Sequence, residues 1–95
     1  MKATNRAVLS AMLGLSLRDH FASSAAEIRA EARRRRRHMA DSTVRRSLRR
    51  LEVDAMVVEW GPLPRSSSEG IRGPRPMTWQ LTAEGKQVAQ EQDLP

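Results

Sequence analysis

Arginine is the side chain through which this sequence could most readily do chemistry. Fifteen of the seventeen basic residues are arginine, and the eleven acidic residues leave a formal net charge of +6. A guanidinium group binds a phosphate, or the O6 and N7 atoms of guanine, through two parallel hydrogen bonds. A G+C-rich coding sequence would explain the preference for arginine over lysine, but not the clustering of the arginines. The clustering indicates a polyanionic partner.

The arginines gather in three segments of the chain. Residues 33–37 are five consecutive arginines, four more lie within 45–50, and three lie in a later stretch rich in Ser, Gly and Pro. At about 100° per residue the first run points in every direction around a helix, so a helix must leave the core there. We expect this run to contact phosphate, with Arg35, Arg36 and Arg37 as its site residues, although a basic turn without fixed contacts fits the same run.

The groups that catalysis or metal binding would need do not converge in the sequence. Cysteine is absent, His20 and His38 are eighteen residues apart, and the serines lie at expected helix caps and loops. We therefore predict that the chain is not an enzyme and holds no metal or other cofactor. The lack of cysteine also excludes a disulfide scaffold.

The apolar segments are too short for a membrane span. The longest nearly apolar stretch, residues 7–17, is interrupted by Ser10 and Gly14 and is followed directly by Arg18. Such a stretch is a poor signal peptide and cannot cross a bilayer. We expect a cytoplasmic, nucleoid-associated protein with no membrane contact.

One mainly helical domain over residues 1–95 is expected to position the arginines. The spacing of apolar residues predicts four helices, over about residues 5–14, 25–36, 42–54 and 83–91. Short polar side chains that accept hydrogen bonds from free backbone amides are expected to cap them, namely Thr4 or Asn5, Ser24, Asp41 or Ser42, and Thr82. Ser24 and Glu27 also have the spacing of a capping box.

The two middle helices have narrow apolar faces. For the second helix the expected face is Ala26, Ile28 and Ala32. In the third helix Val44, Leu48 and Leu51 recur at i, i+4 and i+7, which predicts one buried stripe with the arginines on the other faces.

The segment from about residue 56 to residue 81 is predicted to form a hairpin. Val57 to Trp60 and Met77 to Leu81 have the character of strands, and residues 61–76 between them are too rich in Pro, Gly and Ser for regular structure. The simplest pairing is antiparallel, with a small third strand around residues 20–22. The two tryptophans, Trp60 and Trp79, are expected to pack in the core or across the strands rather than to stack on bases.

Two segments together resemble a known family. The first is Ser42-Thr43-Val44-Arg45-Arg46-Ser47-Leu48-Arg49-Arg50-Leu51 followed by Met56-Val57, and the second is Trp79-Gln80-Leu81-Thr82-Ala83-Glu84-Gly85-Lys86. In type, order and separation they resemble the winged helix-turn-helix transcriptional regulators of bacteria and their phages, broadly MarR-, PadR- or ArsR-like. The resemblance implies an α+β fold, mainly α with a small antiparallel hairpin, in which the helix at 42–54 enters the major groove of DNA.

The resemblance also implies the residues that contact DNA. On the recognition helix they are Ser42, Thr43, Arg45, Arg46, Arg49 and Arg50, and on the wing they are Arg65, Arg72 and Arg75. Ala55 stands where the family usually has a glycine with a left-handed backbone, so we expect Asp54 to make that turn instead.

The expected partner is double-stranded DNA, bound by a homodimer that acts as a sequence-specific repressor. The predicted helices at 5–14 and 83–91 offer the candidate dimer surface. Its expected residues are Met12, Leu13, Leu15 and Val88. No small-molecule effector is expected, since 95 residues leave little volume once the core is filled. The alternative is a winged-helix RNA-binding or protein-docking module of a replication or transfer complex, which exposure of both tryptophans would favour.

Overall fold

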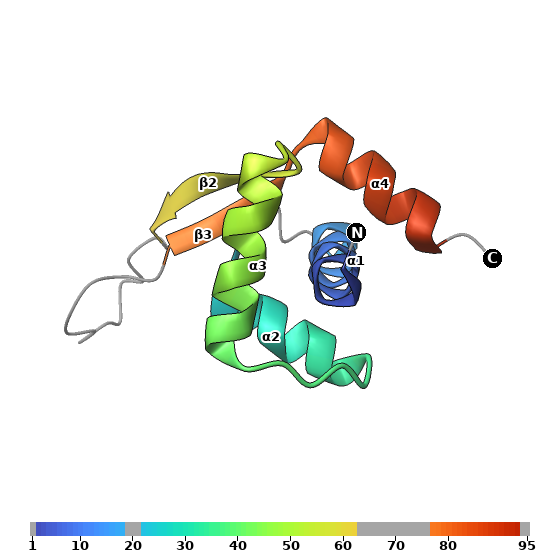
Figure 1. Ribbon diagram of the computed structural model, residues 1–95, viewed down its shortest axis with the longest axis vertical. Helices are drawn as coiled ribbons and strands as arrows, with labels where there is room; N and C mark the ends of the chain where they lie inside the picture. Colours follow the sequence, from blue (N-terminus) through green and yellow to red (C-terminus); the bar gives the residue numbers. More distant parts are fainter. Residues whose placement is uncertain (1, 19–21, 63–76, 94–95) are drawn as a thin grey trace.

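The computed structural model describes residues 2–18, 22–62 and 77–93. In chain order its elements are α1 (Ala3–Leu17), β1 (Ser23–Ser24), α2 (Ala25–Arg34), α3 (Asp41–Val53), β2 (Val57–Pro62), β3 (Met77–Leu81) and α4 (Ala83–Asp93). Figure 1 shows α1 nearly end-on, with the other helices around it and the hairpin of β2 and β3 on the side away from α4. This is the predicted combination of helices and a small antiparallel sheet. None of the described helices is both long enough and apolar enough to cross a membrane.

The start of α1 differs from the prediction. Lys2 is the N-cap residue and no side chain caps the helix, so the expected cap at Thr4 or Asn5 is wrong. Asn5 lies inside the helix and is buried. Its Oδ1 accepts a 2.5 Å hydrogen bond from Oγ of Ser47 on α3, so tertiary packing, rather than capping, uses this side chain.

Gly14 does not end α1, which continues to Leu17. A Cβ atom on Gly14 would lie 2.9 Å from a carboxylate oxygen of Glu31 and closer still to the guanidinium of Arg35. The glycine therefore leaves room for these two side chains of the neighbouring segment to lie against α1.

The start of α2 is the predicted capping box. Oγ of Ser24 accepts a 3.2 Å hydrogen bond from the amide of Glu27, and the amide of Ser24 donates a 3.0 Å bond to the Glu27 carboxylate. The buried residues of α2 are Ala25, Ile28, Glu31 and Ala32. Ala26 is exposed, so its predicted place in the apolar face is wrong. As predicted, the helix ends within the arginine run, at Arg34.

Helix α3 lies within one residue of its predicted bounds. Ala40 is its N-cap residue and no side chain caps it, so the expected cap at Asp41 or Ser42 is wrong. The predicted buried stripe is confirmed, because the three side chains are fully buried: Val44, Leu48 and Leu51.

Two residues after the last residue of α2, and likewise of α3, the backbone is left-handed. These residues are Arg36, with φ 63°, and Ala55, with φ 61°. After each, the next amide bonds back to a carbonyl five residues earlier, at 2.8 Å for α2 and 2.9 Å for α3, which is the Schellman arrangement. Asp54 has φ −83°, so the prediction that it would make the left-handed turn is wrong.

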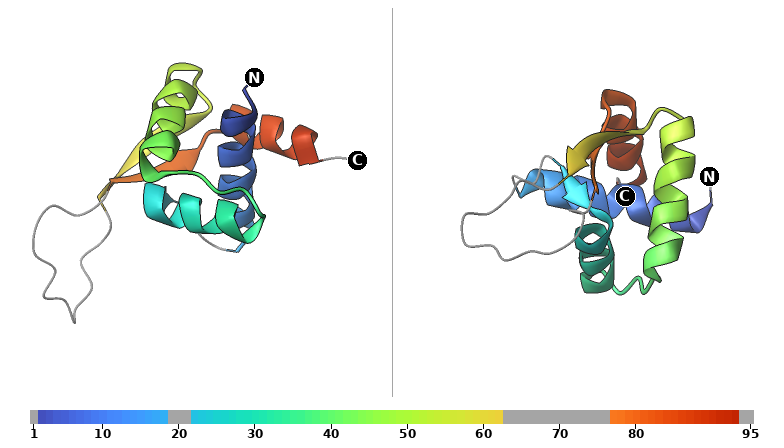
Figure 2. Two further views of the ribbon diagram at one scale, coloured as in Figure 1. Left: turned by 60° about the horizontal axis from the view of Figure 1, so that its bottom comes forward. Right: turned by 90° about the vertical axis from the view of Figure 1, so that its left-hand side faces the viewer.

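The sheet has the order β1-β3-β2 with antiparallel pairing throughout. Val57 lies opposite Leu81, as predicted for the hairpin, and a bulge falls between Glu59 and Gly61. The small edge strand lies at Ser23–Ser24 rather than around residues 20–22, of which 20 and 21 lie outside the described residues. Figure 2 shows β2 and β3 extending away from the helices.

The join between α3 and α4 is held by a threonine and a glycine. Oγ1 of Thr82 accepts a 3.0 Å bond from the amide of Gly85, which confirms the predicted cap, and also donates a 2.7 Å bond to the carbonyl of Ala55. A Cβ atom on Gly85 would lie 2.8 Å from the carbonyl carbon of Met56 and closer still to its oxygen. Only glycine fits here without a shift of the backbone.

The core surrounds α1, which contacts all three of the other helices. Met12, Leu13 and Leu15 are 4%, 5% and 6% exposed and belong to this core, so their predicted role in a dimer surface is wrong. A central helix buries several of its faces, and its apolar residues are therefore not free for a second subunit. Val88 is partly buried against the same core.

We predict that Gly85→Ala destabilises the protein by about 1–3 kcal/mol, because the new methyl group meets backbone that cannot rotate away. Thermal unfolding followed by circular dichroism would measure this as a fall in Tm of roughly 4–8 °C per kcal/mol. Gly14→Ala is the comparison variant, since its methyl group meets side-chain atoms of Glu31 and Arg35 rather than backbone. An equal loss of Tm in both variants would contradict the role assigned to Gly85.

Candidate nucleic-acid interface

The two faces of α3 differ sharply in chemistry. Its buried residues are Val44, Ser47, Leu48 and Leu51. Its solvent-facing side chains are the exposed Ser42, Arg45, Arg46, Arg49 and Arg50, with Thr43 partly exposed. The six residues that the family resemblance implied for DNA contact on this helix are therefore all accessible, and they lie on one continuous element.

The arginines of α3 fall into two kinds. Nε of Arg45 lies 3.0 Å from a carboxylate oxygen of Asp41, and Nε of Arg50 lies 3.6 Å from one of Asp54. These side chains are 70% and 67% exposed, so water weakens both pairs. Arg46 and Arg49 form no ion pair with any residue that the structure describes. Their guanidinium groups are the ones on α3 whose charge is not offset locally.

A groove of about 950 Å³ runs between α3 and the start of α1. Arg46 and Arg50 line it from α3, and Lys2 lines it from the first residues of the chain. Thr4 and Thr43 add hydroxyl groups, so the groove carries the cations and donors that suit a sugar-phosphate backbone. Lys2 was not predicted as a site residue, because nothing in the sequence places it beside residues more than forty positions away.

A second basic surface adjoins the start of α3. Arg29 and Arg33 of α2 line a shallow pocket with His38 and with Ala40, the N-cap residue of α3. The prediction did not include Arg29, and it included Arg33 only as part of the arginine run. Their separation of four residues was a usable signal, since it places both on one face of α2.

Part of the arginine run is used inside the molecule. The carboxylate of Glu31 is only 8% exposed and meets three arginines: it pairs with Arg18, lies 3.5 Å from Arg34 and lies 3.4 Å from Arg35. A carboxylate this deeply buried is stable only with such partners. The sequence did not indicate this cluster, because Arg18 comes from the end of α1.

Arg35 and Arg37 lie at the end of α2 that points away from the strands, as Figure 1 shows for that helix. Both line a cleft against α1 and α4 rather than the groove beside α3. Arg36 is exposed at the left-handed turn. The structure thus brings Ser42 to Arg50 together on α3 but places Arg35 and Arg37 on another side of the molecule.

None of the predicted DNA-binding residues of the hairpin lies in the part of the chain that the structure describes. The predicted wing arginines, Arg65, Arg72 and Arg75, lie outside the described residues. Trp79 is 9% exposed and belongs to the core, as predicted, whereas Trp60 is 57% exposed on β2. No group of three His, Cys, Asp or Glu side chains among residues 2–18, 22–62 and 77–93 could hold a metal ion.

Comparison with known proteins supports the fold. No protein-family model matches the chain, and no curated protein sequence matches it. A double mutant of ZitR from Lactococcus lactis in apo form matches with a TM-score of 0.63 and 19% identity over 96% of this chain and 55% of ZitR. BpsR from Bordetella bronchiseptica, whose DNA binding is regulated by 6-hydroxynicotinic acid, matches with a TM-score of 0.64 and 20% identity.

The match to BpsR covers 96% of this chain and 51% of BpsR, so the chain spans about half the length of these solved structures. At such identities the likeness establishes the fold, which is the winged helix-turn-helix that the two sequence segments predicted. In that fold α2 and α3 are the helix-turn-helix pair, and β2 and β3 are the wing.

One buried hydrogen bond joins α3 to α1, and we predict that Ser47→Ala destabilises the protein by about 1–3 kcal/mol. The substitution leaves the Asn5 oxygen buried without its donor. Urea unfolding would measure the loss. Ser42→Ala on the exposed face is the control and should change stability by less than about 0.5 kcal/mol. Equal stability of the Ser47 variant and the native protein would show that this bond does not hold α3.

Proposed function

We propose that this protein is a sequence-specific regulator that binds double-stranded DNA and represses transcription, with α3 in the major groove. The observation that carries the proposal is a pair of arginines, Arg46 and Arg49, that have no ion-pair partner among the described residues. They lie on the exposed face of a helix whose other face is buried. The major groove admits one α-helix, and a rigidly packed helix presents its side chains at fixed positions along the bases.

Arg46 and Arg49 are proposed to read bases, because a free guanidinium can bond guanine O6 and N7 together. Arg45 and Arg50 would exchange their weak partners, Asp41 and Asp54, for the DNA. Ser42 and Thr43, in the first turn of α3, would contact a phosphate beside the free backbone amides.

The basic surfaces on either side of α3 are proposed to hold the DNA backbone. Lys2 and Arg50 line the groove on the α1 side, and Arg29 and Arg33 lie beside the start of α3 on the α2 side. Positive charge on both flanks would fix the register of the helix in the major groove without reading sequence. The wing arginines, Arg65, Arg72 and Arg75, would add contacts to the adjacent minor groove or backbone.

Arg35, Arg36 and Arg37 remain candidates for a peripheral phosphate contact only. Such a contact needs DNA to reach the end of α2 that points away from the strands. The main binding energy would therefore come from α3 and from the two basic surfaces beside it.

A protein of this kind would bind a palindromic site as a homodimer, with half-sites about one helical turn apart. Exposure of both tryptophans would have favoured the alternative, an RNA-binding or protein-docking module. Trp79 is buried, so a paired stacking platform is not available, and the duplex-DNA proposal is favoured.

Selection of bound duplexes from a random pool is expected to enrich one motif. Arg46→Ala or Arg49→Ala should then relax the preference at one base pair and weaken binding by about 1–3 kcal/mol, or roughly 5- to 150-fold, because one bidentate contact is lost. Fluorescence anisotropy with the enriched duplex would give both affinities.

Lys86→Ala is the matched control for these variants. It removes one exposed positive charge from α4, which does not line the groove beside α3. Its affinity should stay close to that of the native protein. A pool without any enriched motif, or an equal loss in the lysine variant, would overturn the proposal in favour of nonspecific binding.

The salt dependence of binding is a separate prediction. If about six phosphates are engaged, log affinity should fall with log salt concentration at a slope of about −5, because each neutralised phosphate releases condensed cations. Lys2→Ala should make that slope shallower by about one without changing the selected motif. A slope near zero would exclude the proposed backbone contacts.

A further inference from the structure

An acidic residue lies on the exposed surface of α3 at the point where the helix begins. Asp41 is the first residue of α3, and its side chain is 39% exposed. No side chain caps the helix, and Arg45, at 3.0 Å, is the one ion-pair partner of Asp41 among the described residues. A negative charge on a surface that is proposed to bind DNA opposes binding unless it meets a donor there.

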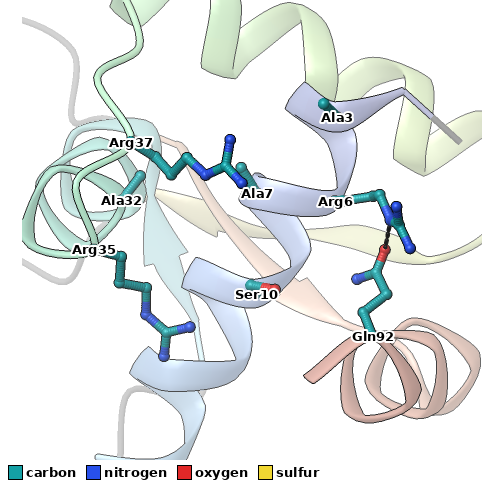
Figure 3. Close-up of a pocket in the computed structure, with 8 residues that line it drawn as sticks. All are labelled: Ala3, Arg6, Ala7, Ser10, Ala32, Arg35, Arg37 and Gln92. Atoms are coloured by element: carbon teal, nitrogen blue, oxygen red, sulfur yellow. Dashed lines mark hydrogen bonds between the residues drawn. The ribbon is translucent and has the colours of Figure 1, made fainter. Parts of the chain in front are cut away.

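A basic surface elsewhere on the protein carries no such acid. Arg6, Arg35 and Arg37 line a cleft between α1, the end of α2 and α4, and none of the described residues that line it is acidic. Figure 3 shows Arg6 in this cleft, joined to the neutral side chain of Gln92. Positive charge alone is enough to attract phosphate, so attraction to the DNA backbone does not require an acid on α3.

Asp41 lies on the same ridge of α3 as two of the arginines. Arg45 and Arg49 follow it at i+4 and i+8, so the three side chains form one row along the helix. The groove between α3 and α1 is lined by a different row, which includes Thr43 and Arg50 but not Asp41. Asp41 therefore projects from the flank of α3 that is turned away from this groove, in line with one of the arginines proposed to read bases.

The proposed DNA complex removes the ion-pair partner of Asp41. When Arg45 exchanges this carboxylate for the DNA, Asp41 keeps its negative charge in the major groove without a cation. The carboxylate then needs a hydrogen-bond donor, and only the amino groups of cytosine and adenine supply one on the base edges there. Guanine and thymine present acceptors, which repel a carboxylate. Cytosine is the one base whose major-groove edge presents a donor and no acceptor.

The acid at the other end of α3 has different surroundings. Asp54 is the C-cap residue, its side chain is 38% exposed, and it lies 3.6 Å from Arg50. It lines the groove beside α1 together with Lys2 and Arg46. These cations stay near Asp54 when Arg50 moves to the DNA, so its charge does not require a donor from a base. Two ion-paired aspartates of nearly equal exposure thus differ in what remains beside them in the complex.

We propose that Asp41 is a specificity-determining residue, whose carboxylate accepts a hydrogen bond from the N4 amino group of a cytosine in the target site. The inference rests on the proposed function, since it needs α3 in the major groove. Repulsion between Asp41 and the DNA lowers nonspecific affinity, and the bond to cytosine restores affinity at the target alone. At 1.5 Å per residue, Asp41 and Arg49 are about 12 Å apart along the helix, which corresponds to about four base pairs.

Selection of duplexes from a random pool with the native protein and with Asp41→Asn would test the inference. One position of the motif, within about four base pairs of the one that Arg49→Ala relaxes, should change from cytosine to adenine. The change is expected because an amide offers adenine both an acceptor and a donor, whereas a carboxylate only accepts. Fluorescence anisotropy at one salt concentration should show that the native protein binds the cytosine duplex about tenfold more tightly than duplexes with guanine or thymine there.

Asp54→Asn is the matched control, because it makes the same chemical change in an ion pair at the other end of the same helix. It should leave the motif unchanged and raise the affinity for all these duplexes alike, by less than about fivefold. Circular dichroism would confirm that each variant is folded.

A duplex with N4-methylcytosine at the selected position tests the contact itself. The methyl group replaces the amino hydrogen that faces the major groove, while pairing with guanine is kept. Binding should weaken about tenfold for the native protein and stay unchanged for Asp41→Ala, which has no carboxylate to accept from that hydrogen.

The inference fails, with the proposed function intact, if Asp41→Asn selects the same motif as the native protein or if Asp54→Asn changes the motif equally. Equal affinity of the native protein for the methylated and unmethylated duplexes would also refute it, because Asp41 would then act only through Arg45. A pool that yields no enriched motif with the native protein would instead refute the proposed function, and the inference with it.

Discussion

The close packing of backbone against backbone at the start of α4 is the constraint on which the rest of the structure depends. Gly85 lies so near the Met56 carbonyl that a methyl group has no room, and Thr82 bonds both the first turn of α4 and the end of α3. The amide of Thr82 also bonds the Met56 carbonyl at 3.0 Å. Because β2 starts and β3 ends at this join, it fixes the base of the hairpin relative to α3.

Helix α3 is positioned from its buried side, so packing does not constrain which residues occupy its exposed side. Val44, Leu48 and Leu51 are fully buried, and Ser47 bonds Asn5 of α1. A helix held in this way keeps its register while the exposed residues carry charge that packing does not need. This separation explains how a small domain can hold many arginines on one helix without loss of its core.

The surplus of positive charge is distributed unevenly, and the distribution has physical causes. Glu31 is buried and collects arginines from α1 and α2, because a buried carboxylate needs several donors. The arginines of α3 have at most weak, exposed partners. Those at the end of α2 face alanines across a cleft. One run of identical residues is thus divided between an internal cluster, a cleft and solvent.

The features that depend on local spacing could be predicted from the sequence. The capping box at Ser24, the buried stripe of α3 and the Thr82 cap each follow from contacts within a few residues, and all three are found. Tertiary structure alone decided the burial of Met12, the place of Asn5, the charge cluster at Glu31 and the two basic surfaces beside α3. These depend on which helix packs against which, and a pattern along one helix cannot show how many of its faces are covered. Gly85 shows both contributions, since the sequence marks the glycine but only the fold brings the Met56 carbonyl against it.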